Sequence, residues 1–192
     1  MWLGCIYAHL TSSLKEKNGN QENTALQIKQ PDKFDSEAIH IMFKIGRTKF
    51  AGIRLIFSQK DQSKSEISDY ADSLPDWLWM RKFVEISKFA YNDEYFENDV
   101  FINIIKYIVK TTVQTGYVYI IATASPMLEP LYAKIGFQPL TLKWKKEIDS
   151  EIQNYTPMIL DTKSVLRGEY MIEKCVWDQV YGPVAEFIDK TK

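Results

Sequence analysis

Two neighbouring segments of the chain, residues 39–45 and 49–57, are mostly apolar, with a few polar side chains between, and are rich in β-branched and aromatic residues. Short segments of this composition are typical of β-strands. Gly46-Arg47-Thr48 separates the segments and contains the glycine that a tight turn favours. The pattern predicts an antiparallel hairpin.

A third strand is predicted over residues 82–91, because successive side chains of a β-strand point to opposite faces and the residues here fall into two such sets. The alternation puts four side chains on one face, Phe83, Glu85, Ser87 and Phe89, and four on the other, Val84, Ile86, Lys88 and Ala90. A carboxylate, that of Glu85, therefore lies beside the hydroxyl of Ser87, while Lys88 projects to the opposite side. On spacing alone the pair is either an ordinary polar strand face or a base next to a group that orients a substrate.

Helical spacing appears after this strand, where apolar residues between 100 and 113 recur every three or four positions. Asn98 or Asp99 can cap the start of this helix and Gly116 can end it. Residues 117–122 form a short apolar strand. A second helix begins after Ser125 or only at Pro130, ends at Gly136, and precedes a strand over 137–144.

The remaining segments carry weaker signals. Residues 13–33 and 59–72 are polar or charged and predict loops, the second of them exposed. Residues 145–192 are expected to add a strand and a closing helix, with no chemistry assigned to them. The order of elements predicts an α/β chain with a mixed sheet, folded as one domain over residues 1–192. Residues 1–33 are its variable N-terminal segment and 145–192 its C-terminal extension.

Composition excludes several classes of protein. The 24 basic and 25 acidic residues give a net charge of −1, without the basic excess of a nucleic-acid-binding protein. Cys5 and Cys175 lie too far apart for a zinc or disulfide framework, and His9 and His40 are too few for a metal site. Reduced thiols favour a cytoplasmic protein. The apolar start, residues 1–10, is too short for an integral membrane segment and has no basic region before it.

The stretch from Phe83 to Ala90 resembles the Glu-x-Ser-Arg-Phe motif of the acyl-homoserine lactone synthases and of the related N-acyl amino acid synthases. Both families are GNAT-like acyltransferases. Upstream, Asp32 and Asp35 resemble their pair of aspartates three residues apart, and Arg54 in Gly52-Ile53-Arg54-Leu55 resembles their strand arginine. Downstream, residues 131–137 resemble the Tyr-x-x-x-Gly-Phe end of the GNAT domain. The resemblance implies a GNAT-like fold, with a central mixed, mostly antiparallel sheet flanked by helices.

Two departures bear on the choice between these families. Lys88 stands where the motif has arginine, which keeps the charge and loses the planar two-pronged fork. The N-terminal Arg, Phe and Trp set of the lactone synthases is not recognisable in residues 1–30. The resemblance therefore favours the N-acyl amino acid synthases, with a lactone synthase acting on S-adenosylmethionine as the alternative and a non-catalytic GNAT-shaped binding module as the third possibility.

The resemblance also implies roles for individual residues. Glu85 would act as a general base, Ser87 would orient the substrate, and Tyr132 would protonate the leaving sulfur. The charged residues Asp32, Asp35, Arg54 and Lys88 would either receive an amino acid acceptor or form a purely structural ion network. The aromatic residues near the third strand, Trp77, Trp79, Phe83 and Phe89, would line the acyl chain or belong to the core.

The expected donor is an acyl-phosphopantetheine thioester on an acyl carrier protein, with no cofactor bound. Residues 92–99 contain four carboxylates and no glycine, so they repel the phosphates of coenzyme A instead of binding them. Carrier proteins are acidic, and a basic surface would dock one. The candidates, which are otherwise an ordinary solvated surface, are Lys44, Arg47, Lys49, Lys106 and Lys110.

Overall fold

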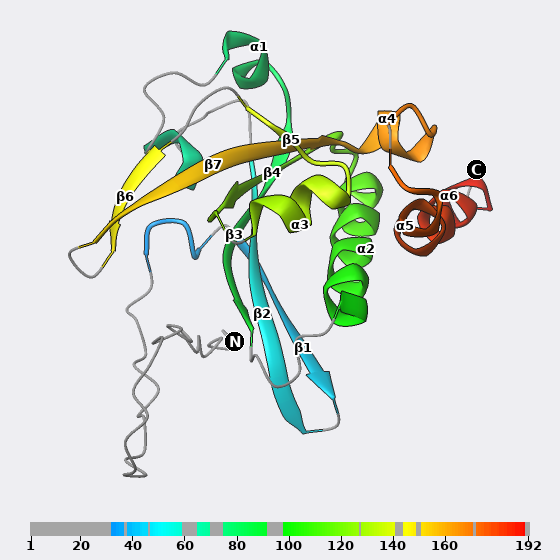
Figure 1. Ribbon diagram of the computed structural model, residues 1–192, viewed down its shortest axis with the longest axis horizontal. Coiled ribbons are helices and arrows are strands. Elements are labelled where there is room, and N and C mark those ends of the chain that lie inside the picture. Colours follow the sequence, from blue (N-terminus) through cyan, green and yellow to red (C-terminus); the bar gives the residue numbers. More distant parts are fainter. Residues whose placement is uncertain are drawn as a thin grey trace.

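The structure is a computed structural model, which describes residues 32–36, 38–45, 47–58, 65–69, 75–91, 98–126, 128–140, 144–148, 151–170 and 172–190. The strands within these ranges form a mixed sheet in the order β1-β2-β3-β4-β7-β5, and β6 pairs with β7 outside this path (Figure 1). The predicted α/β class with a mixed sheet is confirmed.

The first half of the chain follows the sequence pattern closely. β1 (Ala38–Ile45) and β2 (Thr48–Phe57) form the predicted antiparallel hairpin. β3 (Phe83–Tyr91) pairs antiparallel with β2 and parallel with β4 (Tyr119–Ala124). Parallel neighbours need a long crossover, which here includes α2 (Asn98–Gln114), the predicted helix.

The second half differs from the prediction in its strands. α3 (Glu129–Lys134) begins around Pro130, as one of the two alternatives had it. The single strand expected over residues 137–144 is wrong, because β5 (Gln138–Pro139) is two residues long and β6 (Trp144–Ile148) begins at the other end of that range. Pro139 has no backbone N–H to continue a ladder.

The C-terminal region contributes more than the expected strand and helix. β7 (Glu151–Asp161) lies between β4 and β5 in the sheet, so it is an interior strand. Three short helices follow: α4 (Thr162–Leu166), α5 (Lys174–Val180) and α6 (Gly182–Asp189). Tyr181, between the last two, is fully buried and donates a hydrogen bond to the carbonyl of Ile135. The three C-terminal helices and Tyr181 thus contribute side chains to the core.

Apolar side chains cover both faces of the sheet. The larger cluster joins β2, β3, β4 and β7 to α2, α3, α5 and α6. The smaller cluster, on the opposite face of β3, consists of Ile67, Leu78, Phe83, Ile121 and Leu140. Ile67 belongs to the 3₁₀ turn η2 (Glu66–Asp69) and Leu78 to α1 (Asp76–Trp79). The exposed loop predicted over residues 59–72 is therefore wrong for Ser65 and Ile67, which are both buried.

The central strands separate part of the way along the sheet. The pairing of β3 with β4 ends at Ile86 and Ala122, yet β3 continues to Tyr91 against β2, and β4 continues to Ala124 against β7. Residues 87–91 thus have no partner strand on the β4 side among the described residues. We call this opening the β3–β4 split. None of the helices in the described ranges is both long and apolar enough to span a bilayer.

Gly136 allows the chain to turn between α3 and β5. Its φ is +95°, and a Cβ there would lie 2.6 Å from Cδ1 of Ile172. Gly168, with φ of +71°, has no atom within 4 Å of the same position. An L-residue in the left-handed region costs about 1–2 kcal/mol, and forced overpacking costs about 1–3 kcal/mol more.

We therefore expect Gly136→Ala to lower the free energy of unfolding clearly more than Gly168→Ala. Urea unfolding followed by circular dichroism measures both values. Equal losses in the two variants would show that the contact with Ile172 contributes nothing.

Candidate active site

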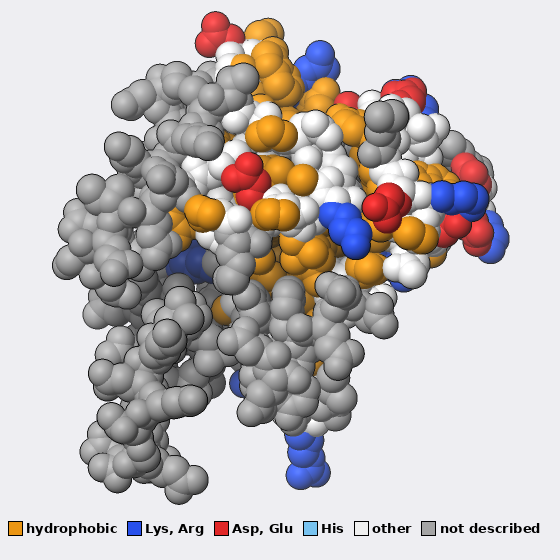
Figure 2. Space-filling view, in the orientation of Figure 1, with side chains coloured by type: hydrophobic (Ala, Val, Ile, Leu, Met, Phe, Trp, Pro, Cys, Tyr) orange, Lys and Arg blue, Asp and Glu red, His pale blue; other side chains and the backbone are white. Residues whose placement is uncertain are grey.

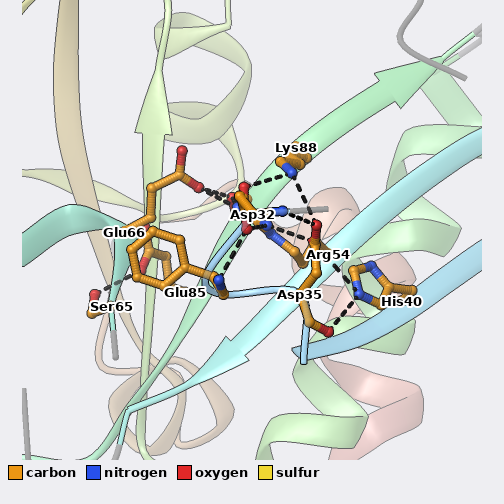
Figure 3. Close-up of polar contacts among 10 residues, drawn as sticks. Asp32, Asp35, His40, Arg54, Ser65, Glu66, Glu85 and Lys88 are labelled. Atoms are coloured by element: carbon orange, nitrogen blue, oxygen red, sulfur yellow. Dashed lines mark hydrogen bonds and ion pairs between the residues drawn. The ribbon is translucent and has the colours of Figure 1, made fainter. Parts of the chain in front are cut away.

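A β-bulge in β3 changes which side chains share a face. Between the pairs Gly52–Ala90 and Arg54–Ser87, β2 advances two residues and β3 advances three. The extra residue is accommodated at Lys88, whose φ is +48°. Lys88 consequently turns toward the Ser87 side and bonds Asp32 (Figure 3). The predicted alternation is wrong from this residue onward, and Phe89 packs on the helix side against Phe101.

Arg54 is the centre of a network of buried polar contacts. Its side chain is fully buried on β2, opposite Ser87 on β3. Nη1 donates to Oδ1 of Asp32 and to Oδ1 of Asp35, both at 2.7 Å. Nη2 donates to Oε2 of Glu66 at 2.7 Å and to Oγ of Ser87 at 2.9 Å. Figure 3 shows these groups converging on the guanidinium from separate segments.

Asp32 and Asp35 belong to a short turn that stabilises itself. The backbone N–H of Asp32 donates to Oδ2 of Asp35 at 2.7 Å, and that of Phe34 donates to Oδ1 of Asp32 at 3.0 Å. Lys88 reaches the same turn, with Nζ 2.6 Å from Oδ2 of Asp32. The four charged residues that the motif pointed to are thus brought together by the fold.

Mutual pairing shifts the pKa values of Asp32 and Arg54 in favour of their charged forms. Burial alone raises the pKa of Asp32, but hydrogen bonds from Lys88 and Arg54 outweigh it and lower the pKa to about 2. Burial also opposes the charge on Arg54, but bonds to Asp35 and Asp32 leave its pKa raised. Two cations therefore face three carboxylates in this network, the third being Glu66.

The geometry discriminates between the two roles open to Arg54. Its four terminal N–H groups already have acceptors, and the side chain is not exposed. This arrangement leaves no terminal donor for an acceptor's carboxylate, so it favours the structural ion network, and either role of Arg54 stays a prediction. The side chains of Lys88 and Asp32, 17% and 36% exposed, are the members at the rim.

Glu85 lies next to this network and is buried as well. Its Oε2 accepts a hydrogen bond from Oγ of Ser65 at 2.6 Å, and the backbone N–H of Ile67 also donates to it. Burial raises the pKa of Glu85 to about 7; the bond from Ser65 opposes the rise and the charge of Glu66 adds to it. Its neighbour Ile86 makes the last pair before the β3–β4 split.

No protein-family description and no curated protein sequence matches the chain. Solved structures do. FeeM, described as an N-acyl amino acid synthase from uncultured soil microbes, has a TM-score of 0.54 at 16% identity, covering 66% of this chain and 69% of FeeM. BjaI, described as a coenzyme A-dependent acyl-homoserine lactone synthase, has a TM-score of 0.51 at 14% identity, covering 80% of this chain and 68% of BjaI. Identities this low establish the fold alone.

The chain has the GNAT-like fold. The expectation drawn from Glu85, Ser87 and the residues upstream is thereby confirmed at the level of architecture, a mixed sheet flanked by helices. Within this GNAT-like sheet, Glu85 and Ser87 share one face of β3, as predicted, and both are buried.

The aromatic candidates do not form one lining. Phe83 lies in the smaller cluster, and Trp77, 47% exposed, contacts the ring of Tyr119 at 5.9 Å between centroids. Phe89 lies in the larger cluster on the other face because of the bulge. The side chain of Trp79 is outside the described residues.

Tyr132 is a core residue of α3. Its ring lies 5.8 Å from that of Phe101 and 5.0 Å from that of Phe137, between centroids. Burial raises the pKa of its phenol, so the hydroxyl keeps its proton. A donor role for Tyr132 stays a prediction.

Sequence reasoning missed Ser65 and Glu66, because they lie in a stretch that is charged and serine-rich. The feature of the sequence that could have indicated a buried turn was Ile67, a lone apolar residue between polar neighbours. Its side chain is fully buried and anchors the turn in the core. Residues 92–99, whose carboxylates are predicted to repel the phosphates of coenzyme A, lie largely outside the described residues.

Arg54→Lys tests the structural role of the network. A lysine keeps one charge but cannot replace four directed N–H donors, so the partly buried carboxylates around it lose partners. We expect the free energy of unfolding to fall by roughly 3 kcal/mol. The matched control, Arg167→Lys, alters an exposed ion pair with Glu169 and should change stability by less than about 0.5 kcal/mol. Similar values for both variants would contradict the network's role.

Proposed function

We propose that this chain is an N-acyltransferase that moves a long-chain fatty acyl group from an acyl carrier protein thioester to the amine of an amino acid. The observation that carries the proposal is Glu85, a buried carboxylate with a pKa of about 7 beside the β3–β4 split. A base with a pKa near the working pH accepts a proton effectively and is also able to release it.

The β3–β4 split supports a thioester donor. Residues 87–91 offer backbone N–H and C=O groups on the side away from β2, where an extended pantetheine arm can pair as an added strand. A backbone N–H of this segment would then polarise the thioester carbonyl. The donor carbon would lie next to the polar residues of β3.

The proposed reaction transfers one proton before and one after the acyl step. Glu85, directly or through a water, takes a proton from the acceptor ammonium, and the free amine attacks the thioester carbon. The new C–N bond forms as the C–S bond breaks. The nitrogen then loses its second proton, and the departing thiolate gains one from Tyr132, which is reprotonated by the proton that the nitrogen has lost. Glu85 releases the first proton to solvent, and the products are an amide and the free thiol. Ser87 orients the carbonyl or the water.

Charge supports a carrier protein as the donor. Lys44, Arg47 and Lys49 are exposed on the β1–β2 hairpin, and a little further along β2, Ala51 and Gly52 pair with the end of β3. In Figure 2 basic side chains project at the bottom of the molecule, at the tip of this hairpin. The hairpin thus offers an acidic carrier protein a basic surface near the open part of β3. The four carboxylates of residues 92–99 disfavour coenzyme A.

The acceptor is the less constrained part of the proposal. Lys88, at the rim, would bind an acceptor carboxylate in exchange for Asp32, while Asp32 and Asp35 would receive its ammonium group. FeeM, a structural neighbour, is named for acylating amino acids. BjaI supports a second candidate, an acyl-homoserine lactone synthase that uses S-adenosylmethionine.

Incubation of the protein with acyl carrier protein loaded with a long-chain acyl group distinguishes the candidates. One reaction contains the twenty amino acids and the other S-adenosylmethionine, and mass spectrometry identifies the products. We expect N-acyl amino acids, formed with a higher kcat/KM from the carrier protein than from the same acyl group on coenzyme A. Acyl-homoserine lactone as the main product would support the second candidate, and no product from any donor would reject both.

Glu85→Gln tests the general base. Glutamine keeps the size of the side chain and cannot take up a proton, so we expect kcat/KM to fall by about 10²- to 10⁴-fold. In the wild-type enzyme kcat/KM should rise with pH through about 7 as Glu85 loses its proton, and this limb should vanish in the variant. A variant within about threefold of wild type would remove Glu85 from the chemistry and leave positioning alone.

A further inference from the structure

The turn from Ser65 to Ile67 encloses the carboxylate of Glu85. Ser65, which is 1% exposed, donates its hydroxyl to Oε2 at 2.6 Å, and Ile67 donates its backbone N–H. Two donors from one turn hold a carboxylate in a defined orientation. Glu66, between these donors, is directed to the other side of the site in Figure 3, toward Arg54.

The turn itself is anchored at two points. Ile67 is fully buried in the smaller cluster with Leu78 and Phe83. Glu66 accepts from Nη2 of Arg54 at 2.7 Å and from the hydroxyl of Ser87. Displacing the turn would expose Ile67 and leave the buried guanidinium with a missing acceptor, which is costly. The donors to Glu85 are therefore held firmly in place.

Among the described residues, two charged side chains have a large effect on Glu85. Its partners on the neighbouring strands, Ile56 of β2 and Ile121 of β4, are apolar. The charged groups that influence it are Glu66 from η2 and Arg54 from β2. Burial raises the pKa of Glu85 most, the hydroxyl of Ser65 lowers it, and the negative charge of Glu66 raises it. Two adjacent residues thus act on one carboxylate in opposite directions.

We propose that Ser65 and Glu66 are positioning residues of this site: Ser65 fixes the orientation of the Glu85 carboxylate, and the charge of Glu66 controls whether that carboxylate carries a proton. This inference rests on the proposed function, because it gives Glu85 the role of base. Neither residue has to touch the substrate. Their effects would be seen in the protonation of Glu85 and in the pH profile of the reaction.

The experiment follows the titration of Glu85 directly, by NMR of protein labelled with ¹³C in the glutamate carboxyl groups, with Glu85→Gln used to assign the signal. Glu66→Gln removes the charge and keeps an oxygen that accepts from Arg54 and Ser87. We expect it to move the titration of Glu85 to lower pH by about one pH unit. Ser65→Ala removes a donor to the ionised carboxylate and should move the titration to higher pH.

Two further variants serve as controls. Ser65→Thr keeps the hydroxyl and should return the titration close to that of the wild-type protein. Glu169→Gln removes an exposed carboxylate of the Arg167 pair and should leave Glu85 unchanged. In the acyl-transfer assay, the rising limb of kcat/KM against pH should follow the NMR midpoint in each variant, while the KM for the donor stays within about twofold of wild type.

Opposite shifts in Glu66→Gln and Ser65→Ala support the proposal, since general loosening of the site would move both in the same direction. Folded variants, judged by melting temperature and near-ultraviolet circular dichroism, that leave the titration unchanged would overturn it. If Glu66→Gln does not fold, Glu66→Asn, which also removes the charge, takes its place in this comparison, while Ser65→Ala and Ser65→Thr decide the role of Ser65. Wild-type protein that makes no acyl product would reject the proposed function, while the NMR titration would still decide whether Ser65 and Glu66 control Glu85.

Discussion

The burial of the Arg54 guanidinium is the constraint on which the rest of this site depends. A buried cation costs several kcal/mol unless its N–H groups have acceptors and its charge is balanced. Here the acceptors come from three segments that are distant in sequence: the turn at Asp32 and Asp35, the η2 residue Glu66, and Ser87 of β3. Each segment is ordered by the same charge. The network therefore holds the turn at Asp32 and Asp35 and the turn η2 against the central strands.

The bulge at Lys88 determines where the charged network lies relative to the β3–β4 split. A lysine in the left-handed region costs about 1–2 kcal/mol, so the surrounding contacts must hold it there. Two contacts do so: the ion pair of Lys88 with Asp32 and the packing of Phe89 against Phe101. Ile86, just before the bulge, is also the last residue of β3 that pairs with β4. One extra residue thus brings a cation to the rim of the network at the start of the β3–β4 split.

The sequence predicted the elements in which local pattern and tertiary structure agree. The hairpin of β1 and β2 follows from its residue types and its glycine-containing turn, the strand β3 and the helix α2 follow from periodicity, and the charged cluster follows from the resemblance. The bulge could not be predicted, because alternation counts residues and does not show where one is inserted. The place of β7 between β4 and β5 depends on long-range pairing, which local propensity does not encode. Ser65 and Glu66 were missed because polar residues buried by their partners look like any exposed loop.

The two kinds of carboxylate in this site have opposite effects on stability, and the sign follows from the direction of each pKa. Asp32 has a pKa of about 2, below its ordinary value, so its pairing stabilises the fold above the ordinary pKa and is lost as the pH falls toward 2. Glu85 has a pKa of about 7, above its ordinary value of about 4.3. Protonated Glu85 therefore contributes fully to the stability of the fold below about pH 4.3, and this contribution is lost as the pH rises through 7. The ionised form of Glu85 that a base requires is therefore the less stable one in this fold. The pairing of Asp32 with Lys88 and Arg54 is fully present in that same pH range, and its stabilising effect offsets part of the cost of an ionised, buried carboxylate at the β3–β4 split.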